Sequence, residues 1–352
     1  MKKLQITFFA LFFALLALVG ALSLFGPQRA FSETENRTLK TRDSLKFTLA
    51  SGRFAEDFER VLCEQFPGRD KTVSARSAAL LLTGRTDQNG AYVGKGRLFQ
   101  KITVPDLAAA QRESEKLKGL ASSRPGLPVY VMPVPGAAAQ LGDLLPKYAP
   151  VYDPAPVYDL FSAEGMRLID LRETLTSPED YFKTDHHWTL SGAYKAYAAF
   201  RAAKGESAPP LSAFAPETVS RSFYGTLSSK VPGARVPPDE VQTVAVPAGV
   251  TAVADGKEIP VYDLAALEGR DHYRVFFGGN YGILELTNPA APGGTLLVLR
   301  DSFANCFAPF LLGDYSKIVL VDERYTAVSL PSLVDDWAAD EVLMVREAGF
   351  GS

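Results

Sequence analysis

Apolar residues fill the first segment of the chain without any regular alternation with polar ones. Residues 4–25 are almost wholly apolar on every face of a helix, and Lys2 and Lys3 precede them. Their number matches the roughly 20 residues that span a bilayer, and flanking lysines favour the cytoplasmic side. We therefore expect residues 1–28 to form an uncleaved, single-pass signal anchor that leaves the rest of the chain extracytoplasmic. Secretion after signal cleavage is the alternative.

The next segment, residues 29–86, is predicted to be a juxtamembrane stretch followed by helices. Apolar residues recur at helical spacing between residues 52 and 83, and Pro67-Gly68 divides this pattern into two helices. In residues 89–99, glycine-containing turns stand between short β-prone runs, which predicts a hairpin.

Residues 87–352 are predicted to form one α/β domain. Buried strands are expected at residues 127–135, 167–172, 296–299, 317–322 and 341–347. Helices are expected at residues 104–123, 137–145, 189–204, 302–313 and 330–338. Short strands that are apolar on both faces and alternate with helices indicate a central, mainly parallel sheet covered on both sides. A segment rich in Pro, Val and Gly, at about 205–278, is predicted to be an insertion of short strands and loops.

Composition narrows the classes of function. The 37 basic and 40 acidic residues give a net charge of −3 and form no long run of one sign, so nucleic acid is not an expected partner. Cys63 and Cys306 are the only cysteines, which argues against structural zinc and iron–sulfur sites. Whether these two cysteines pair in a disulfide stays open.

A serine at a turn between a buried strand and a helix is the first candidate for chemistry. Ser302 follows the strand at 296–299 directly, within the sequence LRDSF. Such a turn holds the hydroxyl outward, and backbone N–H groups near it can bind a developing oxyanion. The alternative is that Ser302 only caps the helix.

Two of the three histidines of the chain form the second candidate, in the sequence TDHHWT at 184–189. If this segment is extended, Asp185 and His187 share a face and His186 points away. The carboxylate of Asp185 would then orient the imidazole of His187 as a base for a serine. Metal binding by Asp185, His186 and His187 is an alternative that diverging neighbours disfavour, and a purely structural cluster is another. His272 stands apart in the insertion.

These two motifs resemble those of the DHHW family, which is similar to alginate O-acetyltransferase proteins of the AlgX and AlgJ type. The sequence TDHHWTLSGAYKAY precedes LRDSF in the order typical of that group. Four further stretches resemble the family: SETENRTL at 32–39, FPGRDKTV at 66–73, NGAYVGKGRLF at 89–99 and FYGTLSSK at 223–230. The resemblance extends from about residue 32 to residue 347.

The resemblance implies an SGNH-hydrolase-like, three-layer α/β/α fold and a Ser-His-Asp triad. Ser302 matches the nucleophile, His187 the base and Asp185 the orienting carboxylate. Trp188, Thr189, Arg300 and Asp301 match supporting positions. Candidates for the oxyanion donors are Gly279, Asn280 and the backbone N–H of Ser302, although a simple turn between strands is the preferred interpretation of residues 278–280. No metal and no other cofactor is expected.

The function that follows is O-acetyl transfer to a cell-surface polysaccharide, as in exopolysaccharide biosynthesis. The resemblance implies that a membrane-bound O-acyltransferase supplies the acetyl group. Two alternatives stay open: a carbohydrate O-acetyl esterase, and a non-catalytic glycan-binding or scaffold protein of an envelope acetylation system. The sequence does not distinguish among them.

Overall fold

The chain folds into two compact units, and the computed structural model describes residues 2–45 and 53–350. The first unit comprises residues 1–88 with 229–234, and the second comprises residues 89–228 with 235–352. The first unit contains α1 (Lys2–Phe25), β1 (Phe31–Ser32), β2 (Arg37–Thr38), a 3-10 helix (Arg42–Ser44), α2 (Arg53–Glu64), α3 (Arg69–Leu82) and β3 (Asp87–Gln88). The two helices predicted around Pro67-Gly68 are therefore confirmed.

Helix α1 presents apolar side chains over almost its whole surface. Ser23 is the one buried residue among its 24, and the helix is long and apolar enough to cross a membrane. The segment that follows binds its last turn: Gln28 Nε2 donates to the Ser23 carbonyl at 2.9 Å, and Arg42 Nη1 donates to that of Leu24 at 3.2 Å. The end of the apolar helix is thus a folded part of the first unit.

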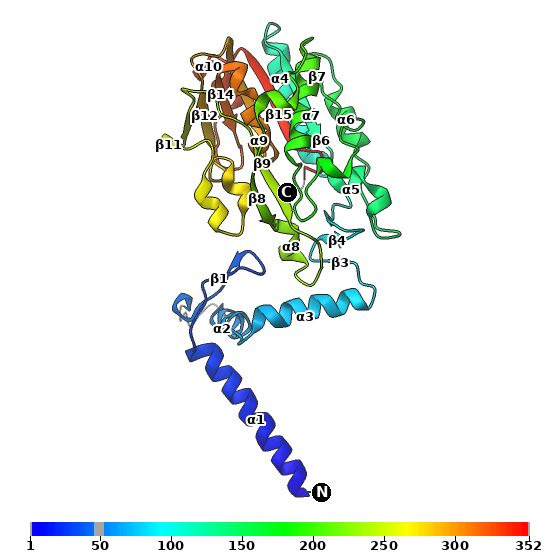
Figure 1. Cartoon of the computed structure of the whole chain (residues 1–352), viewed down its shortest axis with the longest axis vertical. Helices are drawn as coiled ribbons and strands as arrows, with labels where there is room; N and C mark the ends of the chain where they lie inside the picture. Colours follow the sequence, from blue (N-terminus) through cyan, green and yellow to red (C-terminus); the bar gives the residue numbers. More distant parts are fainter. Residues whose placement is uncertain (1, 46–52, 351–352) are drawn as a thin grey trace. The chain divides into compact units, whose positions relative to one another are not determined.

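The second unit is built on an eight-stranded sheet (Figure 1). Its strand order is β11 (Lys257–Ile259), β10 (Thr251–Ala254), β12 (Ile283–Thr287), β14 (Tyr315–Val321), β13 (Gly293–Arg300), β15 (Glu341–Glu347), β6 (Val129–Val134), β7 (Arg167–Leu168). The five strands from β14 to β7 are parallel, whereas β11, β10 and β12 join antiparallel. The predicted mixed α/β class with a mostly parallel sheet is confirmed.

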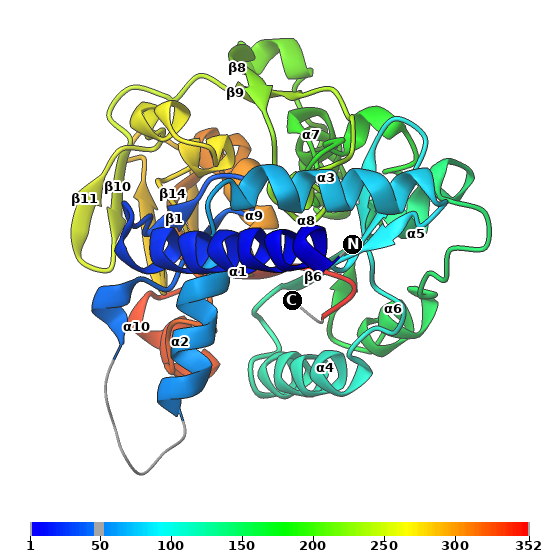
Figure 2. The same cartoon turned by 90° about the horizontal axis from the view of Figure 1, so that it is seen from below.

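Alternating side chains of the central strands belong to two hydrophobic clusters, one on each face of the sheet. On β13, Leu296 and Val298 belong to one cluster and Leu297 and Leu299 to the other. Helices α7 (Leu190–Ala203) and α9 (Phe303–Phe307) pack in the first cluster. Helices α4 (Leu107–Ser123), α6 (Ala155–Phe161) and α10 (Leu330–Asp336) pack in the second (Figure 2). This double cover explains why the strands lack a polar face.

Three predicted elements differ from the structure. Of the strand expected at 167–172, only Arg167–Leu168 pair, at an edge of the sheet, because the Asp170 carboxylate accepts from the Arg172 backbone and turns the chain. The helix expected at 137–145 is α5 (Ala137–Gln140) followed by a 3-10 turn (Gly142–Leu144). Helix α9 continues only as a 3-10 helix (Ala308–Gly313), because Pro309 has no N–H to donate.

The loop-rich segment at 205–278 is more integrated than an appended insertion. It contains a 3-10 helix (Leu211–Phe214), β8 (Glu217–Phe223), α8 (Thr226–Lys230), β9 (Asp239–Thr243), β10, β11 and two 3-10 helices (Leu264–Glu268 and His272–Val275). Strands β8 and β9 pair with each other, whereas β10 and β11 extend the main sheet beyond β12. The predicted hairpin is present as β4 (Ala91–Val93) and β5 (Leu98–Gln100). Cys63 and Cys306 are both free thiols.

Candidate active site

The loop that carries the two adjacent histidines is a tight turn and not an extended segment. An isolated bridge joins Tyr181 to Trp188 at its base, and the Asp185 Oδ1 atom accepts from the backbone N–H of His187 at 3.1 Å. This local hydrogen bond, typical of Asp in turns, brings Asp185 and His187 together. The expectation that His186 points away is wrong, because its ring centroid lies 3.9 Å from that of His187.

Three side chains from two distant parts of the chain form one line of hydrogen bonds. Nδ1 of His187 lies 2.5 Å from Oδ1 of Asp185, and Nε2 of the same ring lies 2.7 Å from Oγ of Ser302. Asp185 and His187 are 2 % and 5 % exposed, so little water competes for these bonds. The sequence positions predicted to meet therefore do meet, across 115 residues of chain.

The charge of Asp185 sets the tautomer of His187. Its Oδ2 accepts from the backbone N–H and the hydroxyl of Thr226, at 2.8 and 2.9 Å. Burial alone would raise the pKa of Asp185, but the charges of His186 and His187 and the hydrogen bonds of His187 and Thr226 hold it below its usual range. An ionised carboxylate accepts only, so Nδ1 of His187 carries the proton and Nε2 accepts from Ser302.

Ser302 stands at the junction of β13 and α9, and its hydroxyl does not cap the helix. Ser302 thus occupies the N-cap position of α9 without a capping hydrogen bond from its side chain. Its backbone N–H makes no hydrogen bond within the described residues. Asp301 secures the turn on both sides, because its carboxylate accepts from the backbone of Phe303 at 2.9 Å and of Glu347, at the end of β15, at 2.7 Å.

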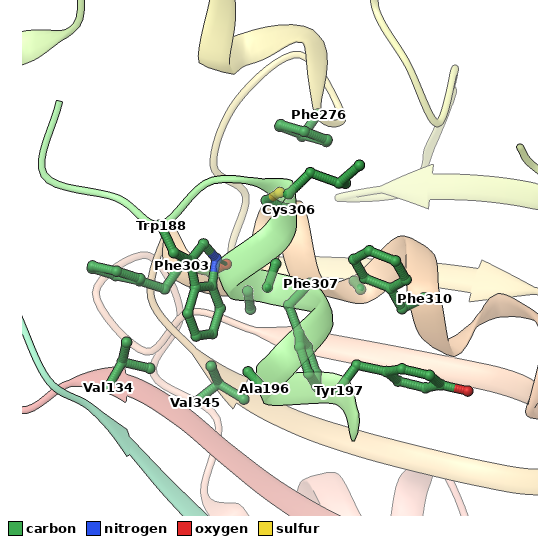
Figure 3. Packing of buried hydrophobic residues seen from close by; sticks show 14 of the residues in the cluster. Val134, Trp188, Ala196, Tyr197, Phe276, Phe303, Cys306, Phe307, Phe310 and Val345 are labelled. Carbon is green, nitrogen blue, oxygen red and sulfur yellow. Dashed lines mark hydrogen bonds between the residues drawn. The ribbon is translucent and has the colours of Figure 1, made fainter. Parts of the chain in front are cut away.

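The supporting residues named from the sequence hold the loop and the turn together. The Trp188 indole is buried and donates to the Phe303 carbonyl at 3.0 Å, next to Ser302 (Figure 3). The Thr189 hydroxyl accepts from Gly192 N–H and caps α7. Loop 181–188 is thereby fixed between α7 and the β13–α9 turn.

The other expected oxyanion donors lie beside Arg300. This buried guanidinium donates to the side-chain oxygens of Asn305, at 2.7 Å, and of Asn280, at 3.2 Å. The Asn280 oxygen also accepts from Asn305 at 2.9 Å, which leaves its amino group without a partner within the described residues. No hydrogen bond there joins Gly279 or Asn280 to Ser302, so their part in the site stays a prediction.

The metal alternative has some geometric basis. One ligand atom from each of Asp185, His186 and His187 lies within 4.8 Å of the others. However, both ring nitrogens of His187 and both oxygens of Asp185 already take part in hydrogen bonds. An ion bound there would have to break the line from Asp185 to Ser302.

Residues 168–321 match the family described as DHHW protein. The resemblance predicted from the motifs is confirmed. This DHHW region contains Asp185 and His187 as well as Ser302, together with the whole segment between them. A search of curated proteins gave no match.

Solved structures with the same fold include a DHHW family protein from Eubacterium siraeum. It is 21 % identical, with a TM-score of 0.62 over 76 % of this chain and 94 % of its own. PatB1 of Bacillus cereus, solved with a sulfonyl adduct, is 18 % identical, with a TM-score of 0.61 over 74 % and 96 %. The O-acetyltransferase domain of Pseudomonas putida AlgJ matches more weakly, at 15 % identity and a TM-score of 0.44 over 74 % and 92 %.

Tyr273 and Thr226, both within residues 168–321, support the line of hydrogen bonds, and neither residue was singled out from the sequence. Tyr273 stacks on the His187 ring, with centroids 4.0 Å apart and planes at 8°, and its hydroxyl donates to the Ser302 carbonyl at 2.9 Å. The neighbouring His272 bonds Ser220 and the Gly269 carbonyl and so fixes the short helix that carries Tyr273. Thr226 did have a signal, since it lies in the family-like stretch 223–230.

Gly225 offers a test of how tightly Asp185 is held. A Cβ atom at this position would come closer to the Asp185 side chain than the 3.0 Å that real contacts respect. We expect Gly225→Ala to lower the free energy of unfolding by about 1–3 kcal/mol and to displace the carboxylate, with loss of activity. Chemical denaturation and ester turnover measure the two effects. Gly142→Ala is the control, because a Cβ there meets no atom within 4 Å.

Proposed function

We propose that this protein is a membrane-anchored, extracytoplasmic serine enzyme that transfers acyl groups. The observation that carries the proposal is the 2.7 Å approach of Ser302 Oγ to His187 Nε2, with Asp185 on the other ring nitrogen. A serine is a weak nucleophile at neutral pH, and a neutral imidazole within hydrogen-bond reach is what activates it. A serine that served only as a helix cap would point its hydroxyl to the backbone instead.

The reaction divides into two steps. Ser302 Oγ attacks the carbonyl carbon of an ester donor as His187 Nε2 takes its proton. The donor's alcohol then leaves with that proton, and the acyl group remains on Ser302. In the second step His187 removes the proton of an acceptor hydroxyl, whose oxygen attacks the acyl carbon and releases Ser302. The negative charge of Asp185 stabilises the imidazolium formed in each step.

The oxyanion of each tetrahedral intermediate needs hydrogen-bond donors. The backbone N–H of Ser302 is one such donor, since no other group within the described residues uses it. The free amino group of Asn280, held through its oxygen by Arg300, is the second donor that we propose, with Gly279 as its neighbour. One donor of this kind contributes about 3–4 kcal/mol to the stability of a transition state.

The acyl group and the acceptor follow from the resemblance of the two motifs. We propose an acetyl group, a hydroxyl of a cell-surface polysaccharide as acceptor, and a membrane-bound O-acyltransferase as supplier of the acetyl donor. Helix α1 would hold the enzyme beside such a partner. With water as the acceptor the same site would act as an acetyl esterase, and the amounts of free acetate and acetylated oligosaccharide formed distinguish the two activities.

A sulfonyl fluoride tests the activation of Ser302 without knowledge of the substrate. We expect phenylmethylsulfonyl fluoride to form one adduct, on the peptide that contains Ser302, because the activated Oγ displaces fluoride from sulfur. PatB1, which shares the fold, was solved with an adduct of this class. Mass spectrometry of the full chain should show no adduct in His187→Ala. Equal labelling of wild type and His187→Ala would contradict the proposal, and abolition by a metal chelator would favour the metal alternative.

A further inference from the structure

Two of the family-like stretches lie outside the catalytic machinery and fold together in the first unit. The Ser32 hydroxyl donates to the Asp70 carboxylate at 3.2 Å, and Arg69 pairs with Glu35. Residues 32–39 and 66–73 are therefore joined by charged groups immediately after helix α1. Neither stretch contributes to the triad. We therefore look for a separate function of these charged contacts between residues 32–39 and 66–73.

The network borders a cavity of about 480 Å³. Arg29, Arg69 and Lys71 line it with positive charge, and Asp70 is the one acidic residue among the lining groups. Leu22, in the last turn of α1, and Phe66, which is 38 % exposed, supply apolar walls. Arg29 and Arg69 are each paired with a carboxylate, that of Asp70 and that of Glu35, whereas Lys71 forms no ion pair within the described residues. The unpaired charge of Lys71 beside the apolar walls makes the cavity complementary to a negatively charged group that is joined to an apolar one.

The cations are positioned in different ways. Gln65 braces Arg29 by accepting from its backbone N–H and donating to its carbonyl, both at 2.9 Å, and the Arg29 guanidinium bonds Asp70 at 2.7 Å. The ammonium group of Lys71 makes no hydrogen bond or ion pair within residues 2–45 and 53–350. Lys71 is therefore the lining cation free to bind a ligand without first losing a partner.

The length of α1 places the cavity at the surface of a membrane. A helix of 24 residues is about 36 Å long, whereas the hydrocarbon core is about 30 Å thick. With Lys2 and Lys3 in one headgroup layer, Leu22 reaches the opposite layer after roughly 30 Å. The cavity beside Leu22 then lies at the depth of the phosphates of that leaflet, whichever way the helix is oriented.

We propose that this cavity binds the phosphate of an anionic phospholipid headgroup, with Lys71 and Arg29 on the phosphate oxygens. Leu22 and Phe66 would contact the apolar part of the same lipid. The site depends on an uncleaved α1 and is independent of the acyl chemistry. It would hold the first unit against the membrane surface through a specific contact in addition to the anchor.

The test uses the full chain in nanodiscs, with Lys71→Glu compared to Arg76→Glu. Both residues are exposed cations of α3 and both changes alter the charge equally, but Arg76 does not line the cavity. After extraction into detergent, native mass spectrometry counts the phosphatidylglycerol retained by each protein. We expect Lys71→Glu to weaken retention about tenfold and Arg76→Glu to leave it unchanged, because charge-assisted bonds to phosphate are strong and short-ranged.

Three results would overturn the proposal. Equal loss in both variants would mean that only the general surface charge of α3 attracts lipid. No loss in either would mean that the cavity holds no phospholipid. Equal retention of phosphatidylcholine and phosphatidylglycerol by the wild type would remove the requirement for an anionic headgroup. If Lys71→Glu lowers the melting temperature, Lys71→Gln replaces it, with a smaller loss of retention expected.

Discussion

Turnover of a chromogenic acetyl ester should fall by roughly 10⁴-fold or more when Ser302 is replaced with alanine. The reason is that Oγ of Ser302 is the hydroxyl bonded to Nε2 of His187, and covalent catalysis has no other nucleophile there within the described residues. The fold should change little, because this hydroxyl makes no bond to the backbone. The melting temperature of the variant should therefore stay near that of the wild type.

The matched control is Ser316→Ala, which removes a serine hydroxyl at the start of β14 that, among the described residues, donates to the Gly294 carbonyl alone. This variant should retain full turnover. If Ser302→Ala is as active as Ser316→Ala, the observed ester cleavage does not pass through Ser302 and the acyl-enzyme proposal fails. If both variants lose activity together with their melting transition, the loss reports unfolding. The sulfonyl adduct on Ser302 of the wild type then tests the acyl-enzyme proposal instead.

Replacing Asp185 with asparagine should cost about 10⁴-fold in turnover, a loss typical of a reversed histidine tautomer. The two donors of Thr226 point at Oδ2, so the oxygen of the new amide is expected to stay there. Its amino group then faces Nδ1 of His187 and donates to it. The proton of the ring moves to Nε2, which can no longer accept the proton of Ser302.

The same substitution also removes an acceptor from the His187 backbone N–H, so a modest loss of stability accompanies it. Urea titration separates that loss from the catalytic effect, since turnover is measured well below the unfolding midpoint. Asp106→Asn serves as the control, because Asp106 caps α4 and asparagine caps a helix equally well. A turnover of Asp185→Asn within tenfold of the wild type would exclude tautomer control by Asp185.

Much of the fold could be predicted because its signals are local. The apolar runs of β6, β13, β14 and β15, the cap at Thr189 and the break at Pro67-Gly68 each depend on a few neighbouring residues. The two motifs likewise predicted the partners His187 and Ser302. Ser302 lies at the carboxyl end of β13, where α/β folds commonly place functional residues, and the loop before α7 brings His187 to it.

What could not be predicted depends on contacts between segments far apart in the sequence. The pairing of Asp185 with His187 was expected from an extended backbone, but a turn with a side-chain cap produces it, and this turn also brings His186 to the same side. Tyr273 has no motif around it, and its role emerges only when the loop at 205–278 folds back over His187. The shortness of edge strand β7 could not be predicted either, because it results from a local turn at Asp170 that competes with strand pairing.

The loop-rich segment at 205–278 has a consequence for how the proposed activity could diversify. It contributes Thr226, which donates to the Asp185 carboxylate, Tyr273, which stacks on His187, and two outer strands of the sheet. No minimal catalytic core can therefore be trimmed from this chain by deleting it. Grafting the equivalent segment from a relative would exchange the groups that hold Asp185 and His187, so any such change is expected to alter the proposed catalytic power together with the surroundings of the site.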